Sequence, residues 1–226
     1  MNLYREVKTK ENLKDKIKKE AEELFDGEYA NVIVKSDVCY WRKFNALHKY
    51  FADRFGGEDN DNCVNMYMEI TDIEELLNML KDLLSKIKVG EGLVDNGYTY
   101  ETKEANEEID TERGKIKARD LENGDIITEK DKDKGWVESI RKTDKDVSYK
   151  KVFKEKGRVV LNPEICNKML PTEEGFFFGG TDYDEYYLAD IEDTIPMLQK
   201  VIDKHKELIK KGYKEYDITY YYRAWY

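Results

Sequence analysis

The side chains best suited to chemistry in this sequence lie in the segment YWRKFNALH. If this segment is helical, with about 100° between successive residues, Trp41, Asn45 and His48 share one flank. Arg42 lies just outside that flank, and Lys43 follows it. An indole ring, an amide, an imidazole and two cations suit a planar, anionic ligand. The alternative is that Asn45 and His48 are polar neighbours satisfied within a contact between a helix and a sheet.

A second cluster of polar groups follows a glycine pair. Backbone N–H groups exposed at the start of a helix can bind phosphate without a basic side chain. The candidate binding residues here are Gly179, Gly180, Thr181 and Tyr183. Residues 172–194 carry eight acids and no bases, however. Helix capping by Thr181 and Asp184 is therefore the stronger interpretation of this cluster.

Three acids in the same segment raise a third interpretation, a Mg²⁺ or Mn²⁺ site. Asp182, Asp184 and Glu185 lack the spacing of a known metal loop, and no second ligand cluster accompanies them. The three cysteines are far apart and include no CxxC pair, which argues against a zinc site and a disulfide scaffold. The sequence also lacks the Gly-x-Ser-x-Gly motif of serine nucleophiles, the Walker phosphate-binding loop and the HExxH zinc motif. We therefore predict no metal, no cofactor and no catalytic residue.

The elements that would position these residues are predicted from hydrophobic periodicity. Helices are expected over residues 10–26, 40–55, 71–88, 162–170 and 188–209. Strand-like runs cover residues 30–34, 63–70 and 213–226. Thr71 and Glu74 form a potential capping box for the third helix. Pro196 should kink or restart the last helix, with Thr194 as the new N-cap.

Residues 89–161 differ in character from the rest of the chain. The Leu-rich helical period gives way to short alternating segments such as GYTYETK and KGRVVL, separated by turn signals. Acids dominate residues 91–112, and bases dominate residues 141–158. We expect an inserted β-rich subdomain here, flanked by a discontinuous core domain of residues 1–88 and 162–226. The predicted fold is α+β, with a helical core packed against a small mixed or antiparallel sheet.

The overall composition excludes some classes of protein. The 226 residues include 39 bases and 49 acids, so the net charge of −10 argues against nonspecific nucleic-acid binding. No apolar segment is long enough for export or membrane spanning, so we expect a cytoplasmic protein. Six of the 17 tyrosines lie in the last 14 residues, on both faces of the expected strand. Such rings can stack bases or be covered by another subunit, and we expect a homo-oligomer.

Two segments resemble a family of bacteriophage-encoded proteins of undefined function. They are VCYWRKFNALHKYF (38–51) and MLPTEEGFFFGGTDYDEYYLADIEDTI (169–195). The family pattern is roughly YWRK-x-N-x-x-H-x-WF followed by LLPT-x-x-GFFFG-x-T-x-YD-x-Y. The matching residues are Tyr40, Trp41, Arg42, Lys43, Asn45, His48, Pro171, Thr172, Gly175, Gly179, Thr181, Tyr183, Asp184 and Tyr186. The chain departs from the pattern at Tyr50, where the family has Trp, and in its long insertion.

The resemblance implies a phage protein made inside a bacterium. We therefore expect an anti-defence protein that binds and sequesters a small nucleotide-derived immune signal without cleaving it. Trp41 would stack the base, Arg42 and Lys43 would neutralise phosphate, and His48 and Thr181 would donate hydrogen bonds. One alternative is an inhibitor or adaptor that docks on a host protein through the charged insertion. A further alternative is a metal-dependent phosphodiesterase that uses the three acids named above.

Overall fold

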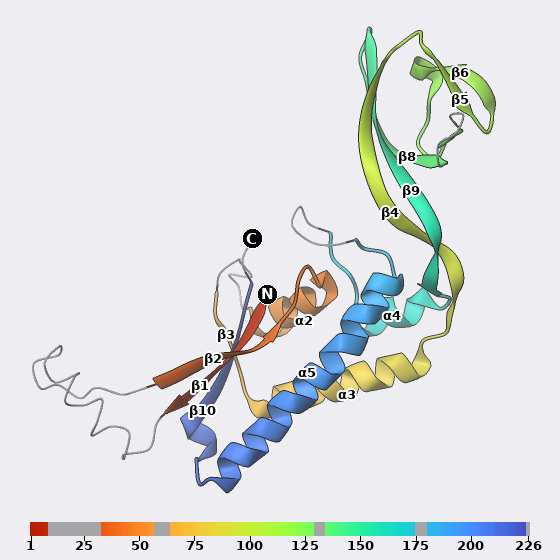
Figure 1. Ribbon diagram of the computed structural model, residues 1–226. Coiled ribbons are helices and arrows are strands. Elements are labelled where there is room, and N and C mark those ends of the chain that lie inside the picture. Colours follow the sequence, from red (N-terminus) through yellow and green to blue (C-terminus); the bar gives the residue numbers. More distant parts are fainter. Residues whose placement is uncertain (9–32, 57–63, 129–133, 175–179, 225–226) are drawn as a thin grey trace, which may run out of the picture. The chain divides into compact units, whose positions relative to one another are not determined.

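The chain divides into two compact units (Figure 1). Unit 1 comprises Met1–Lys88 and Leu161–Tyr226, and unit 2 comprises Val89–Val160. The computed structural model describes residues 1–8, 33–56, 64–128, 134–174 and 180–224. Of these residues, 40% are in strands and 37% in helices. The expectation of a helical core with a small sheet is therefore wrong, because each unit is built on an extensive antiparallel sheet and the fold is sheet-rich α+β.

A four-stranded antiparallel sheet forms the base of unit 1. Its strands, in the order β2-β1-β10-β3, are β2 (Ile33–Tyr40), β1 (Asn2–Lys8), β10 (Ile218–Arg223) and β3 (Met66–Met68). A 3-10 turn, η2 (Glu215–Asp217), precedes β10. Burial alternates strictly along β10, where Ile218, Tyr220 and Tyr222 are buried. The tyrosine-rich tail is thus a strand with one face in the core, as period-two alternation predicts.

Four helices complete unit 1 in the part of the chain that the structure describes. They are α2 (Asn45–Phe55), α3 (Ile70–Lys86), α4 (Pro163–Met169) and α5 (Glu185–Lys210). The rings of Phe51 in α2 and Tyr222 in β10 stack with centroids 4.2 Å apart. The apolar stripe of α3, with Ile73, Leu77 and Leu80, is buried as the helical period predicts. Within the described residues, no helix is both long and apolar enough to cross a membrane.

The expected helix over residues 40–55 begins later than predicted. Tyr40 ends β2, and α2 starts only at Asn45. Between them, Lys43 has a φ angle of 62°, in the left-handed region that a right-handed helix cannot accommodate. The backbone N–H of Trp41 donates to the carbonyl of Met1 over 2.9 Å. Trp41, Arg42 and Lys43 therefore precede the helix, and the predicted flank shared by Trp41, Asn45 and His48 is wrong.

The long helix α5 does not restart at Pro196. It runs unbroken from Glu185 to Lys210, so the prediction of Thr194 as an N-cap is wrong. The Thr194 hydroxyl instead donates to the carbonyl of Asp190, four residues earlier, over 2.6 Å. Asp184 is the N-cap, because its carboxylate accepts hydrogen bonds from backbone N–H groups of the first turn.

The start of α3 also differs from the prediction in detail. Its capping box joins Glu69 and Asp72, two residues before the expected pair of Thr71 and Glu74. The short helix at Pro163 is confirmed, with the proline in its first turn. The helix expected over residues 10–26 lies outside the described residues.

Unit 2 is a six-stranded antiparallel sheet in the order β4-β9-β8-β7-β5-β6. Its elements are β4 (Val89–Glu104), β5 (Glu108–Thr111), β6 (Gly114–Lys117), the 3-10 turn η1 (Ala118–Asp120), β7 (Ile126–Ile127), β8 (Gly135–Lys142) and β9 (Asp146–Val160). The two long strands β4 and β9 pair along most of their length (Figure 1). Unit 2 has a small hydrophobic core of its own. Its buried residues are Ala105, Ile109, Ala118, Leu121, Ile127, Val137, Val147 and Tyr149.

Candidate functional site

Two of the expected binding side chains in unit 1 have partners inside the fold. The indole N–H of Trp41 donates to the hydroxyl of Thr194 over 2.8 Å. The Nδ1 atom of His48 lies 2.9 Å from the hydroxyl of Tyr222. Trp41 and His48 are each only 4% exposed. Trp41 therefore joins the turn before α2 to α5, and His48 joins α2 to β10, and neither presents a surface to a ligand.

Asn45 links the two sequence clusters. Its amide donates to the carbonyl of Gly180 over 2.8 Å, so the structure brings the start of α2 next to the turn before α5. Asn45 is 3% exposed, whereas Gly180 is exposed. Gly179 lies outside the described residues. The hydrogen bond from Asn45 fixes the turn, and this is a structural role.

The remaining residues of the glycine turn also make internal hydrogen bonds. The carbonyl of Thr181 accepts from the hydroxyl of Thr172 over 2.9 Å. The hydroxyl of Tyr183 donates to the side-chain oxygen of Asn167 over 2.6 Å. These bonds fasten the segment that precedes α5 to α4 and the residues after it.

The charged residues of the expected site are exposed but do not converge with the others. Arg42 and Lys43 lie in the turn before α2. Asp184 caps α5, and its neighbours Asp182 and Glu185 complete no metal site: the described parts of the chain contain no group of three His, Cys, Asp or Glu residues arranged to hold a metal.

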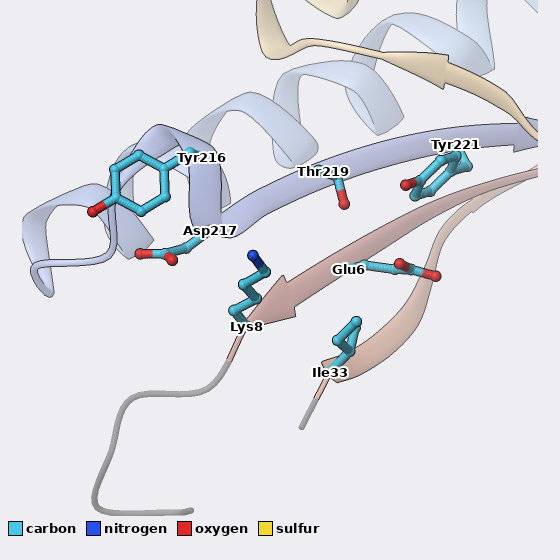
Figure 2. Close-up of a pocket in the computed structure, with 7 residues that line it drawn as sticks. All are labelled: Glu6, Lys8, Ile33, Tyr216, Asp217, Thr219 and Tyr221. Carbon is cyan, nitrogen blue, oxygen red and sulfur yellow. The ribbon is translucent and has the colours of Figure 1, made fainter. Parts of the chain in front are cut away.

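A shallow depression lies on the other face of the unit 1 sheet (Figure 2). It measures about 170 Å³ and is lined by Glu6, Lys8, Ile33, Tyr216, Asp217, Thr219 and Tyr221. Two carboxylates face one ammonium group there. This balance does not suit the anionic ligand that the sequence led us to expect.

A depression of about 240 Å³ in unit 2 has the opposite chemistry. It is lined by Tyr100, Ser139, Ile140, Arg141, Ser148, Tyr149 and Lys150, and none of these residues is acidic. Two cations, two serine hydroxyl groups and the exposed aromatic ring of Tyr100 thus gather on one surface. We refer to this depression as the ribbon site, because it lies on β4, β9 and β8.

Strand register places the side chains of the ribbon site. Lys150 of β9 is the paired residue of Tyr100 in β4 and of Ser139 in β8. In the next row, Ser148 of β9 is paired with Arg141 in β8. Since side chains two residues apart on a strand share a face, these five residues belong to one face of the sheet.

The cations of the ribbon site differ in their environment. Lys150 forms an ion pair with Glu138, and this hydrogen bond raises the pKa of Lys150. Its ammonium group also lies 4.7 Å from the ring centroid of Tyr98, which is 59% exposed. Arg141 is exposed and has no ion-pair partner within the described ranges. Of the two cations of the ribbon site, Arg141 is therefore the more available to an external anion.

The opposite face of the same strands anchors the ribbon site. The hydroxyl of Tyr149 donates to the carboxylate of Glu101 over 2.8 Å, and Lys151 forms an ion pair with the same carboxylate. Burial raises the pKa of Glu101, but the hydrogen bonds from Lys151 and Tyr149 outweigh burial, so the pKa is lowered. The charged carboxylate of Glu101, held by both Tyr149 and Lys151, keeps β4 and β9 in register beneath the site.

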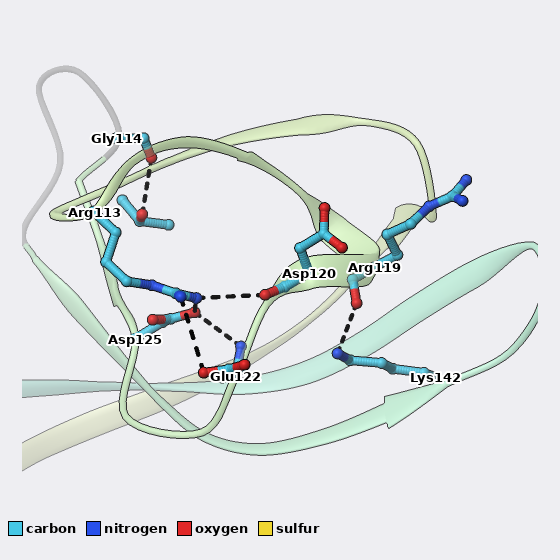
Figure 3. A network of polar contacts seen from close by, with 8 residues as sticks. Arg113, Gly114, Arg119, Asp120, Glu122, Asp125 and Lys142 are labelled. Atoms are coloured by element: carbon cyan, nitrogen blue, oxygen red, sulfur yellow. Dashed lines mark hydrogen bonds and ion pairs between the residues drawn. The ribbon is translucent and has the colours of Figure 1, made fainter.

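A second network closes the small core of unit 2 (Figure 3). Arg113 donates to the carboxylate of Asp125 over 2.5 Å, and the backbone N–H of Glu122 donates to the same carboxylate over 2.8 Å. Lys142, at the end of β8, donates to the carbonyl of Arg119 over 2.7 Å. The bond from Lys142 connects the loop around η1 to β8, the strand that carries Arg141.

Sequence reasoning missed the ribbon site, although its signals were present. The segment GYTYETK was predicted only as a strand, and the charged insertion was predicted, as an alternative, to dock on a host protein. Only the strand pairing shows that Tyr100 and Lys150 are neighbours, 50 positions apart.

Comparison with known proteins adds no relative of this chain. No family model, no curated protein and no solved structure matches it. The candidate site consequently depends on the contacts described above.

Proposed function

We propose that this protein binds a nucleotide at the ribbon site and releases it intact. One observation supports the proposal above all others: Tyr100, Arg141 and Lys150 surround a depression whose lining includes two serine hydroxyl groups and no carboxylate. An aromatic ring with nearby cations and hydroxyl groups is the combination that recognises a base joined to a phosphate.

Each lining side chain has a separate role in this proposal. Tyr100 is 74% exposed and stacks on the base, a contact worth about 1–3 kcal/mol. Arg141 binds phosphate oxygens through its planar guanidinium. Lys150 lies beside it, with its charge already balanced by the ion pair with Glu138. The hydroxyl group of Ser139 donates a hydrogen bond to the ribose or the phosphate. The hydroxyl group of Ser148 does the same while it accepts from Thr102, its partner at 2.9 Å.

The size of the depression limits how much of a ligand it holds. Its volume of about 240 Å³ is below the range of about 300–1,000 Å³ typical of sites that enclose a drug-sized molecule. We therefore propose that the ribbon site takes one nucleotide unit and leaves the rest of a larger ligand in solvent.

The resemblance of two segments to phage proteins supplies the biological part of the proposal. We propose that the ligand is a nucleotide-derived signal of bacterial defence, which the protein sequesters in the cytoplasm of the infected cell. In this proposal the binding residues lie in the insertion. Trp41, Asn45 and His48 then support the fold of unit 1 instead of contacting the ligand.

Thermal unfolding of the full chain tests the proposal. The probes are AMP, ADP-ribose and a set of cyclic dinucleotides, each recovered afterwards and checked by mass spectrometry. A ligand at 100 times its Kd should stabilise the folded state by about 2.7 kcal/mol. We expect at least one probe to raise Tm and to be recovered unchanged.

Variants locate the site in the same experiment. Arg141→Gln and Tyr100→Ala should each weaken binding at least tenfold. The matched controls are Lys145→Gln and Tyr186→Ala, which alter exposed residues outside the ribbon site. Binding that survives both site variants would overturn the proposal. Cleaved ligand would indicate an enzyme instead.

A further inference from the structure

Tyr98 and Tyr100 lie next to each other on the face of β4 that carries the ribbon site. They are two positions apart on the strand, so their side chains project from the same face. Their rings meet edge to face, with centroids 5.5 Å apart and planes at 78°. Both rings are largely exposed, Tyr98 at 59% and Tyr100 at 74%. We call this pair the aromatic corner. It extends the ribbon site beyond the depression, whose lining includes Tyr100 but not Tyr98.

Lys150 is bound to the aromatic corner. Its ammonium group lies 4.7 Å from the ring centroid of Tyr98 and forms an ion pair with Glu138. In strand register Lys150 is paired with Tyr100, so it reaches Tyr98 as a diagonal neighbour. Only 23% of the Lys150 side chain is exposed. The lysine is thus committed to Glu138 and to the ring, and little of its surface is left for a phosphate.

Two irregularities in strand pairing lie directly at the aromatic corner. In β4 the register shifts immediately before Tyr98, and Gly97 has a φ angle of 85° there, in the left-handed region that favours glycine. In β8 the register shifts at Glu138, which is the extra residue of that strand. A β-bulge changes the direction of the side chains beside it. One irregularity therefore sets the position of Tyr98, and the other brings Glu138 within reach of Lys150.

We infer that the base of the ligand lies in the aromatic corner, and that Lys150 is a positioning residue for this corner instead of a phosphate ligand. The inference rests on the proposed function of the ribbon site. A planar base that stacks on the ring of Tyr100 contacts the perpendicular ring of Tyr98 with its edge, so one base contacts both rings. Lys150 holds Tyr98 in this orientation, and Arg141 is the cation that binds the phosphate.

This division of roles makes the base the anchored part of the ligand. An uncharged nucleoside should therefore still bind, although more weakly than its nucleotide, because stacking needs no phosphate. Loss of the guanidinium should affect only a ligand that carries phosphate, whereas loss of a ring contact should affect both kinds of ligand equally. Adenosine and AMP separate these effects, since they share the base and the ribose and differ in the phosphate.

Titration of the full chain with adenosine and with AMP, followed by the NMR signals of the adenine protons, tests the inference. Arg141→Gln should weaken AMP binding about tenfold or more and leave adenosine binding unchanged. Tyr98→Ala should weaken both ligands by the same factor, about fivefold, as expected for one edge-to-face ring contact. Tyr98→Phe keeps the ring and should bind both ligands as the unaltered chain does.

A charge-neutral double variant isolates the role of Lys150. Lys150→Met combined with Glu138→Gln removes the ion pair without changing the net charge of the site, and both ligands should weaken by the same factor, about fivefold or less. Lys150→Arg keeps a cation beside Tyr98 and should preserve both affinities. The matched control is Lys115→Met combined with Asp110→Asn, which removes another ion pair of unit 2 and should change neither affinity.

The outcomes separate this inference from the proposed function. A double variant that weakens AMP but not adenosine would show that Lys150 binds phosphate, and would overturn the inference. So would a Tyr98→Ala variant that binds both ligands as before, or an unaltered chain that binds nucleotides but not adenosine. In these three cases the proposed function stands. A chain that binds no nucleotide probe fails the proposed function, and the inference fails with it.

Discussion

The Nδ1 atom of His48 lies 2.9 Å from the hydroxyl of Tyr222, and both side chains are buried. The second histidine repeats this arrangement, with Nδ1 of His205 3.0 Å from the hydroxyl of Tyr220. The two tyrosines are two residues apart on β10, whereas the histidines come from α2 and α5. Each histidine therefore joins a different helix to the same strand.

Stability should depend on pH through His48. Burial lowers the pKa of His48, and the positive N-terminus lowers it further. As pH falls below about 6.5, the ordinary value, the unfolded chain takes up the proton first, so this part of the stability is complete above that pH and declines below it. Urea unfolding at pH 7.5 and pH 5.5 should show the decline, and His48→Gln should reduce it.

Tyr222→Phe is the control for this prediction. It removes the hydrogen bond and should cost about 1 kcal/mol at both pH values. Because the imidazole stays buried, the dependence on pH should persist. An equal slope in His48→Gln and the unaltered chain would contradict the assignment to His48.

Trp41→Phe should separate structural and binding roles. The variant keeps an aromatic ring but loses the hydrogen bond to Thr194, so we expect a loss of about 1–2 kcal/mol in the free energy of unfolding. Nucleotide affinity should not change, since the ribbon site is in unit 2. A large loss of nucleotide affinity with unchanged stability would indicate that the ligand binds at Trp41, as the sequence led us to expect.

Asp190→Asn should stabilise the protein at neutral pH. Burial raises the pKa of Asp190 to about 6, and the charges of Asp193 and Asp184 add to the effect. The folded state therefore binds a proton on Asp190 more tightly than the unfolded state does. The stability that this protonation provides is lost as pH rises through about 6.

The expected gain from Asp190→Asn at pH 7 is about 1 kcal/mol, less than the shift alone implies because the side chain is only half-buried. The gain should shrink towards zero at pH 4. Asp203→Asn, which changes an exposed carboxylate on the same helix, is the comparison. If both variants behave alike across this range, the effect does not come from burial of Asp190.

Arg113→Gln should destabilise unit 2. The Asp125 side chain is 8% exposed, and the substitution removes its ion-pair partner. Since Arg113 itself is 49% exposed, we expect a measurable loss of stability that is smaller than for a fully buried pair. Lys115→Gln, at an exposed ion pair of the same hairpin, should change stability by less than about 0.5 kcal/mol. Equal effects in the two variants, measured by denaturant unfolding, would rule out a special role for Asp125.

Local patterns in the sequence predicted several elements well. The apolar period of α3, the proline at the start of α4 and the alternation of β10 each reflect interactions between residues close in the chain. The start of α2 was mispredicted because the left-handed Lys43 and the hydrogen bond from Trp41 to Met1 are not visible as a period.

The candidate site shows the same contrast between what local sequence patterns predict and what contacts between distant residues decide. The sequence by itself determined the residue types: the cations and tyrosines of the insertion, the buried aromatic rings of the core, and the acidic net charge. Only the tertiary structure decided which of them meet. Strand register brings Tyr100 and Arg141 to one depression, whereas Trp41 and His48 are used inside unit 1. The physical reason is that pairing between distant strands and burial against distant helices are non-local, so no short window of sequence contains them.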